Sequence, residues 1–274
     1  MSYRISVIEA LRVTGGGILR GHFKGILGYT RYFLYKPAIN DYHDLSILQL
    51  VIYGCGLSLS KNLLERLLRK EPTAIQFNDG SRFVVEDIED FYHASMCYEP
   101  KTLRFILNHL QNGGIFVDVG ANIGGYTIRV AKKARVYALE PHPRNFRLLK
   151  LNLKLNQEKV KNVNIFQAAA GAYSGEAKLF LSDYHGRHSL LSSNGNSDNR
   201  LAIDVDIITL DSILVNEDNI NIIKIDVEGA EPLVLKGANE TLRKTDLVIV
   251  EASSPSFYHT SNILAKYSFK PIKN

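Results

Sequence analysis

The stretch Val117-Asp118-Val119-Gly120-Ala121-Asn122-Ile123-Gly124-Gly125-Tyr126-Thr127 decides the fold class of this 274-residue chain. A short apolar run ends at Val119, a turn of small residues follows, and helical spacing begins near Gly124. Small residues at a strand-to-helix turn let a ligand lie against the backbone at the helix N-terminus. The stretch therefore predicts a ligand-binding turn in an α/β domain.

This turn differs from the G-x-G-x-x-G fingerprint of nicotinamide and flavin enzymes. Asn122 occupies the position of the second glycine, and the acid Asp118 precedes Gly120 by two residues. An acid at that place repels a pyrophosphate but suits the ammonium group of an amino-acid moiety. The turn thus favours a cofactor that carries an amino acid, and a βα turn with a purely structural role is the alternative.

Strand and helix patterns alternate outward from this turn. Strands of this domain are expected at residues 115–119, 135–140, 163–168, 220–226 and 247–251, and helices at 124–133 and 145–155. Strands separated by helices of ten to fifteen residues indicate βαβ units and a mostly parallel sheet.

The alternation is interrupted once, by an expected antiparallel pair of strands. Residues 177–181 and 201–207 alternate between apolar and polar with period two, as half-buried strands do. Between them lies a polar loop, residues 183–200. Long loops in compact domains are usually functional or disordered, and we expect this loop to close over the acceptor site.

Three parts of the chain differ in character. Residues 1–72 are expected to form a basic, mainly helical extension, residues 73–114 a hairpin with a linking helix, and residues 115–274 the cofactor-binding domain. The apolar run at residues 45–59 is interpreted as a buried helix, because it is shorter than the ~20 residues that cross a bilayer. Asn78-Asp79-Gly80, between two short strand-like segments, predicts the hairpin.

The formal charge of +5 is concentrated in the N-terminal part. Residues 1–72 carry ten Lys and Arg against five Asp and Glu, and the remainder carries twenty-three of each. Such a region suits nucleic acid, an anionic membrane surface or a polyanionic glycan, or it is a solvated face. Two cysteines, Cys55 and Cys97, exclude a disulfide scaffold. With no signal or membrane-span pattern, we expect a cytoplasmic protein, and its oligomeric state is open.

Glu140 ends the second expected strand. A carboxylate at this place suits two ribose hydroxyls of a nucleoside-bearing cofactor. Asp118, the glycine turn and Glu140 together, at this spacing, indicate S-adenosylmethionine.

Four further blocks resemble the FkbM-type methyltransferases. They are Glu140-Pro141, Leu210-Asp211, Lys224-Ile225-Asp226-Val227-Glu228-Gly229-Ala230-Glu231 and Lys236-Gly237. The resemblance, from about residue 98 to residue 269, implies a class I methyltransferase Rossmann-like fold, S-adenosylmethionine as donor and O-methylation of sugars or sugar-bearing natural products. One departure is that the antiparallel hairpin closing the usual sheet lacks its last strand, which is either absent or supplied from elsewhere.

The expected cofactor-binding residues gather around the turn, the end of the second strand and the start of the longest block. They are Asp118, Gly120, Ala121, Asn122, Gly124, Tyr126, Thr127, Glu140, Pro141, Ala169 and Asp226.

An oxygen acceptor activated by a base fits the remaining residues best. The chain lacks the Asn/Asp-Pro-Pro-Tyr/Phe motif of DNA adenine methylation, and neither cysteine lies at a strand end as a pyrimidine-methylating nucleophile would. We expect catalysis by Glu228, His188 and Asp226, with His185 and Glu251 as further base candidates.

The expected acceptor is a hydroxyl of a small molecule or glycan. An RNA methyltransferase that uses the basic N-terminal region is the alternative function. A carboxylate pair holding Mg²⁺ is an alternative to a protein base, and no metal is expected.

Overall fold

The computed structural model describes residues 5–9, 32–34, 46–47, 49–52, 72–77, 79–95, 99–110, 113–160, 162–182, 188–191, 201–252 and 254–272. Its centre is a seven-stranded sheet in which every neighbouring pair is parallel. In spatial order the strands are β15 (Lys270–Pro271), β1 (Ile5–Glu9), β14 (Thr245–Glu251), β13 (Ile220–Ile225), β7 (Ile115–Val119), β8 (Arg135–Leu139) and β9 (Val163–Phe166). The expected mostly parallel α/β sheet is confirmed.

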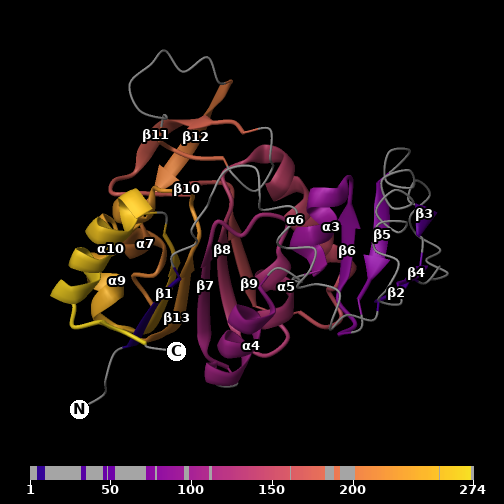
Figure 1. Ribbon diagram of the computed structural model, residues 1–274, viewed down its shortest axis with the longest axis horizontal. Helices are drawn as coiled ribbons and strands as arrows, with labels where there is room; N and C mark the ends of the chain where they lie inside the picture. Colours follow the sequence, from indigo (N-terminus) through magenta and orange to yellow (C-terminus); the bar gives the residue numbers. More distant parts are fainter. Residues whose placement is uncertain are drawn as a thin grey trace.

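Helices cover both faces of this sheet because its central strands are apolar on both sides. On β7, Phe116 packs into one core, and Val117 and Val119 pack into the other. The first core contains residues of α3 (Ile88–Ser95), α4 (Pro100–His109), α5 (Gly125–Val130) and α6 (Pro143–Leu155). The second contains residues of α7 (Leu210–Ile213), α8 (Glu231–Lys236), α9 (Asn239–Arg243) and α10 (Ser254–Lys266). Figure 1 shows α3, α5 and α6 to the right of the central sheet and α7, α9 and α10 to its left.

A small second sheet stands apart from the central one. It has the order β10-β12-β11, with β10 (Ala169–Ala170) parallel to β12 (Ala202–Ile208) and β11 (Gly175–Phe180) antiparallel to it. Figure 1 shows it at the top of the view, above the strands of the central sheet. The inserted antiparallel pair is therefore confirmed, and it forms a sheet of its own.

The predicted hairpin lies between β4 and α3 in the chain. β5 (Thr73–Gln76) and β6 (Arg82–Val85) pair antiparallel. Gly80 in their turn has a φ of +76°, a left-handed conformation that glycine adopts without strain. Two helices, α3 and α4, follow where one linking helix was expected.

The N-terminal part differs from the helical prediction wherever the structure describes it. Between residues 1 and 72 the described elements are the strands β1, β2 (Tyr32–Leu34), β3 (Ser46–Ile47) and β4 (Gln49–Ile52). The interpretation of residues 45–59 as a buried helix is wrong at β3 and β4. A short apolar run has no period of its own, and the β-branched residues in it favour a strand. The rest of the expected helical extension lies outside the described residues.

One strand near the edge of the central sheet, β1, comes from the beginning of the chain. β1 lies between β14 and β15 and pairs with both. Residues 5–9 thus supply an additional strand beside β15, but this strand runs parallel to both neighbours, so among the described residues the antiparallel hairpin of the usual sheet is not formed. The central sheet therefore contains strands from both sides of the boundary expected at residue 72.

Within the part of the chain that the structure describes, no helix combines the length and the apolar character that a bilayer span requires.

Candidate functional site

A cavity lies at the carboxyl ends of β7, β8 and β13, where parallel α/β sheets bind their ligands. It is lined by His93, residues 119–122, Gly125, Tyr126, residues 139–141, Asn145, residues 168–170, Leu179, His188, Leu190, Lys224 and residues 226–228. The structure thus brings together most of the predicted site residues. Asp118, Gly124 and Thr127 do not line the cavity.

The glycine turn is held by the backbone of two neighbouring strands. The N–H groups of Gly120 and Ala121 both donate to the Leu139 carbonyl, at 3.0 and 2.9 Å. Gly120 has a φ of +83°, and a Cβ at this position would lie 1.9 Å from the carbonyl oxygen of Asp226. Glycine is therefore required here by the β7–β13 contact itself, whatever the cavity binds.

Asp118 supports this turn from inside the protein. It is 1% exposed, and its Oδ2 accepts a hydrogen bond from Thr127 Oγ1 at 2.6 Å. Burial raises the pKa of Asp118, although Lys224 and Thr127 oppose the effect. Its Oδ1 and the Oδ1 of Asn122 are buried and have no hydrogen-bond partner among the described residues.

Glu140 presents a fixed carboxylate to the cavity. Its Oε2 accepts from the Asn122 N–H at 2.8 Å, and its Oε1 accepts from the His142 N–H at 2.9 Å. Burial raises the pKa of Glu140 to about 7. Each oxygen keeps a second lone pair, so the carboxylate can also accept from ligand hydroxyls. Asn145, which the sequence analysis missed, is 2% exposed and hydrogen-bonds the same carboxylate.

Two further acidic side chains gather around Asp226 and Lys224, which line the cavity. Lys224 Nζ lies 2.8 Å from Asp226 Oδ2. One oxygen each of Glu99, Asp226 and Glu251 lie within 4.8 Å of one another, a separation that a divalent cation could bridge. The Lys224 ammonium supplies a positive charge beside these carboxylates. Lys224 and Glu99 were not predicted from the sequence.

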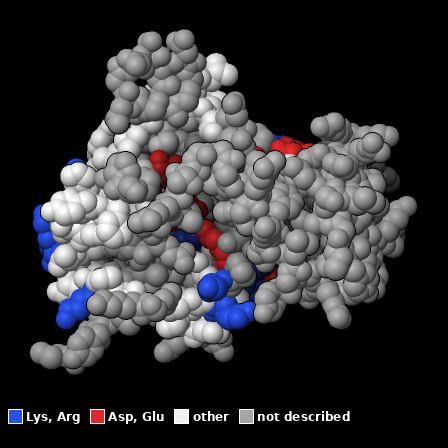
Figure 2. Space-filling model, viewed as in Figure 1, with Lys and Arg blue, Asp and Glu red and all other residues white. Residues whose placement is uncertain are grey.

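Figure 2 shows where charge gathers on one face of the molecule. Acidic side chains follow a hollow near the middle of the face, with some Lys or Arg surface beside them, and further Lys and Arg lie toward the lower and left margins of the face.

The segment 188–191 carries His188 to the cavity. The His188 ring packs against the ring of His142, with 4.2 Å between centroids, and its Nδ1 accepts from the Ser182 N–H at 3.1 Å. Ser189 Oγ donates to the Glu228 carbonyl at 2.9 Å and so joins this segment to the turn after β13. His185 and most of the predicted acceptor loop lie outside the described residues.

The turn after β13 gives Glu228 an unusual backbone conformation. Glu228 has a φ of +51° and is followed by Gly229 at +102°. The buried Glu231, at the start of α8, accepts from the Gly229 N–H at 2.7 Å and holds this turn. Glu231 therefore has a structural role, because it accepts a hydrogen bond from the backbone of this turn.

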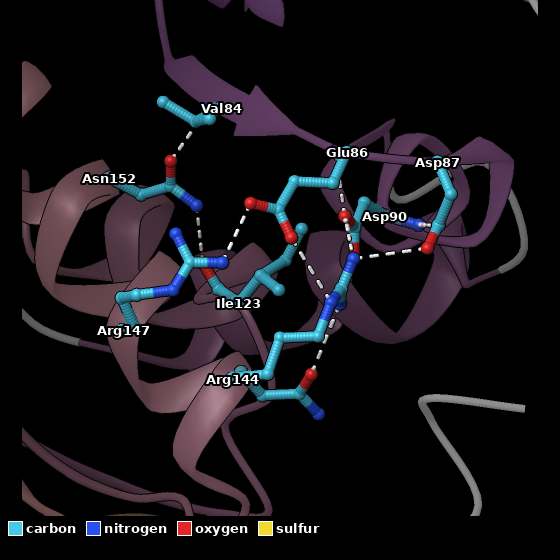
Figure 3. A network of polar contacts seen from close by, with 9 residues as sticks. Val84, Glu86, Asp87, Asp90, Ile123, Arg144, Arg147 and Asn152 are labelled. Carbon is cyan, nitrogen blue, oxygen red and sulfur yellow. Dashed lines mark hydrogen bonds and ion pairs between the residues drawn. The ribbon is translucent and has the colours of Figure 1, made fainter. Parts of the chain in front are cut away.

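Polar contacts fasten α6, which carries Asn145, to the hairpin and α3. In Figure 3 the Arg144 guanidinium lies among three carboxylates, and its NH2 is 2.7 Å from Asp90 Oδ2. Asn152 accepts from the Val84 N–H at 2.7 Å and donates to the Ile123 carbonyl at 2.8 Å (Figure 3). These contacts fix one wall of the cavity relative to the glycine turn.

Comparisons with known proteins identify the family. The model of the methyltransferase FkbM domain matches residues 118–271, so the chain belongs to the FkbM methyltransferase family. Hexuronic acid methyltransferase AglP of Haloferax volcanii is 28% identical over 176 residues, which cover 63% of this chain and 70% of the relative. Methyltransferase sdnD of Sordaria araneosa is 28% identical over 223 residues, covering 68% and 83%.

Among solved structures, a methyltransferase FkbM from Methylobacillus flagellatus KT is similar to this chain. It has a TM-score of 0.44 and 21% identity, and the match covers 58% of this chain and 38% of that one.

Proposed function

We propose that this member of the FkbM methyltransferase family transfers the methyl group of S-adenosylmethionine to a hydroxyl oxygen of a sugar, either free or within a glycan or natural product. The observation that carries the proposal is the placement of the Glu140 carboxylate beside the Gly120 turn, in a cavity whose opposite end holds proton-accepting groups. When bound, the donor supplies a methyl group on a positively charged sulfur.

The residues that would hold the donor follow from the geometry. Glu140 would accept the ribose hydroxyls, and Asn145 would hold that carboxylate. Small or apolar residues line the cavity near Glu140 and the turn: Gly120, Ala121, Pro141 and Ala169, with Asn122 beside them. Tyr126 also lines the cavity, with its ring centroid 4.8 Å from Lys224 Nζ. Asp118, Gly124 and Thr127 lie outside the lining, so we propose that they act by supporting the turn.

The other end would take the acceptor. Asp226, Glu228 and His188 line the cavity and are our proposed proton acceptors. A sugar hydroxyl has a pKa far above 7, so a positioned base accelerates the reaction, typically ~10²–10⁴-fold. A sugar acceptor is supported by the family and by the relative whose name describes a hexuronic acid methyltransferase.

Calorimetry of donor binding tests the role of Glu140. Glu140→Gln is expected to bind S-adenosylmethionine at least about tenfold more weakly, because charge-assisted hydrogen bonds are worth ~1.5–3 kcal/mol each. Wild-type affinity in this variant would remove the basis of the cofactor assignment.

The same binding has a predicted pH dependence. Because the pKa of Glu140 is about 7, the carboxylate that accepts hydroxyl protons is mostly lost below that value. Donor affinity should therefore rise about tenfold between about pH 6 and pH 8. The amino group of the donor titrates equally with both proteins, so the curve of Glu140→Gln is the control and should be flatter.

Transfer of a labelled methyl group tests the acceptor class. We expect label from S-adenosylmethionine in a glucuronic acid glycoside or a glucose glycoside, and none in RNA. Label in RNA alone would support the nucleic-acid alternative instead. His188→Ala, Glu228→Gln and Asp226→Asn, assayed against pH at saturating donor, then separate the three proton acceptors.

A further inference from the structure

Lys224 is a buried cation in the wall of the cavity. It is 3% exposed, and its Nζ lies 2.8 Å from Asp226 Oδ2 and 4.8 Å from the centroid of the Tyr126 ring. All three side chains line the cavity. The ammonium therefore has a carboxylate and an aromatic face as its partners at the acceptor end.

Further acids surround this ion pair. Glu99 and Glu251 each bring one oxygen within 4.8 Å of Asp226, and the Tyr126 hydroxyl donates a hydrogen bond to Glu99 Oε2. Burial acts to lower the pKa of Lys224, but the charges of Asp226 and Glu99 hold it above its usual value. The lysine is thus a permanent positive charge at neutral pH.

The positive charge of Lys224 in turn affects the protonation of the neighbouring acids. Burial raises the pKa of Glu251 to about 10, the neighbouring Asp226 and Glu99 add to the effect, and Lys224 opposes it. Without the ammonium, carboxylates this close repel one another and take up protons. The ion pair therefore favours a negative charge on Asp226.

We propose that Lys224 is a positioning residue that binds one oxygen of Asp226 and leaves the other to take the proton of the acceptor hydroxyl. The inference rests on the proposed function and selects Asp226 from the three proton acceptors. The hydroxyl proton passes to Asp226 while the acceptor oxygen bonds to the methyl carbon. The carbon–sulfur bond of the sulfonium donor breaks with its electron pair staying on sulfur, and Asp226 then releases the proton to water.

The first test requires neither donor nor acceptor. Carbon-13 NMR of protein labelled at the aspartate carboxyls, with the Asp226 signal assigned by Asp226→Asn, follows the ionisation of this side chain. In Lys224→Met, which keeps the length but not the charge, the Asp226 signal should show that this side chain keeps its proton to a higher pH than in the wild type, because the neighbouring ammonium is gone. Lys224→Arg should restore most of the difference. An unchanged titration in Lys224→Met would overturn the proposal.

The second test uses the glycoside that the wild-type protein methylates. Lys224→Met should lower kcat at least about 100-fold and change donor affinity, measured by calorimetry, less than about threefold. Adding Asp226→Asn to Lys224→Met should cost little more, because the two residues act as one unit. A wild-type kcat in Lys224→Met, or two losses that multiply, would contradict the proposal.

A matched control removes an equivalent ion pair elsewhere. Lys178 and Asp204 are also 2.8 Å apart, but their side chains are 61% and 72% exposed. Lys178→Met should leave kcat near the wild-type value. If the wild-type protein transfers no methyl group, the proposed function fails, and the NMR titration still decides whether Lys224 controls Asp226.

Discussion

Gly120 shows how a single residue joins two strands of the site. Its left-handed backbone and the nearby Asp226 carbonyl leave no room for a side chain. The glycine therefore sets the distance between the donor end of the cavity and the turn that carries the acids. The need for a glycine at position 120 therefore comes from its contact with the Asp226 backbone and not from the ligand.

Substitution of this glycine gives a residue-scale prediction. Gly120→Ala should lower the free energy of unfolding in urea by roughly 3 kcal/mol or more, because left-handed strain and the clash with backbone add together. Gly113 is the control, since it has a φ of +79° and no described atom within 4 Å of an added Cβ. Gly113→Ala should cost only about 1–2 kcal/mol. If both variants lost the same free energy of unfolding, the clash with the Asp226 carbonyl would not contribute to the destabilisation.

At the scale of elements, the position of α6 decides one wall of the cavity. This helix carries Asn145 at its start, and Asn152 further along it bonds the backbone of both β6 and the glycine turn. The hairpin is thus part of the support of the site, although it precedes the cofactor motifs in the chain.

Removal of the Asn152 amide tests this support. Asn152→Ala should lower the free energy of unfolding by about 2–4 kcal/mol, because the buried Val84 N–H and Ile123 carbonyl lose their partner. Asn164 on β9 is exposed, and Asn164→Ala should change stability by less than about 0.5 kcal/mol. Similar losses in the two variants, measured by urea denaturation, would contradict the bridging role.

At the scale of the whole molecule, a strand from the beginning of the chain, β1, is inserted between two strands from its end, β14 and β15. β1 pairs with β14 over five positions, Ile5 to Glu9, and with β15 over two. The sheet thus requires residues that lie outside the family match.

Deletion of this strand should be costly. A chain lacking residues 2–9 should melt roughly 5–10 °C lower and aggregate more readily, because an edge of β14 becomes unpaired. A chain lacking residues 2–4, which leaves β1 in place, is the control. Equal melting temperatures of the two chains in calorimetry would show that β1 does not stabilise the sheet.

The sequence by itself determined the parallel α/β sheet, the hairpin, the inserted antiparallel pair and the family. These features follow from local patterns: the spacing of apolar residues, the small residues at Gly120 and the turn residues at Gly80. It also predicted that Asp118, Glu140, Asp226 and Glu251 lie at one edge, since parallel strands end together.

Only the tertiary structure decided how Lys224, Glu99 and Glu251 meet Asp226, and that β1 completes the sheet. The three acids come from segments more than twenty residues apart, and their distances depend on strand order and register, which no local pattern contains. A short apolar run such as residues 49–52 also becomes a strand only when a partner strand pairs with it. Pairing partners and buried charges are properties of the packed chain, because burial and proximity exist only after folding.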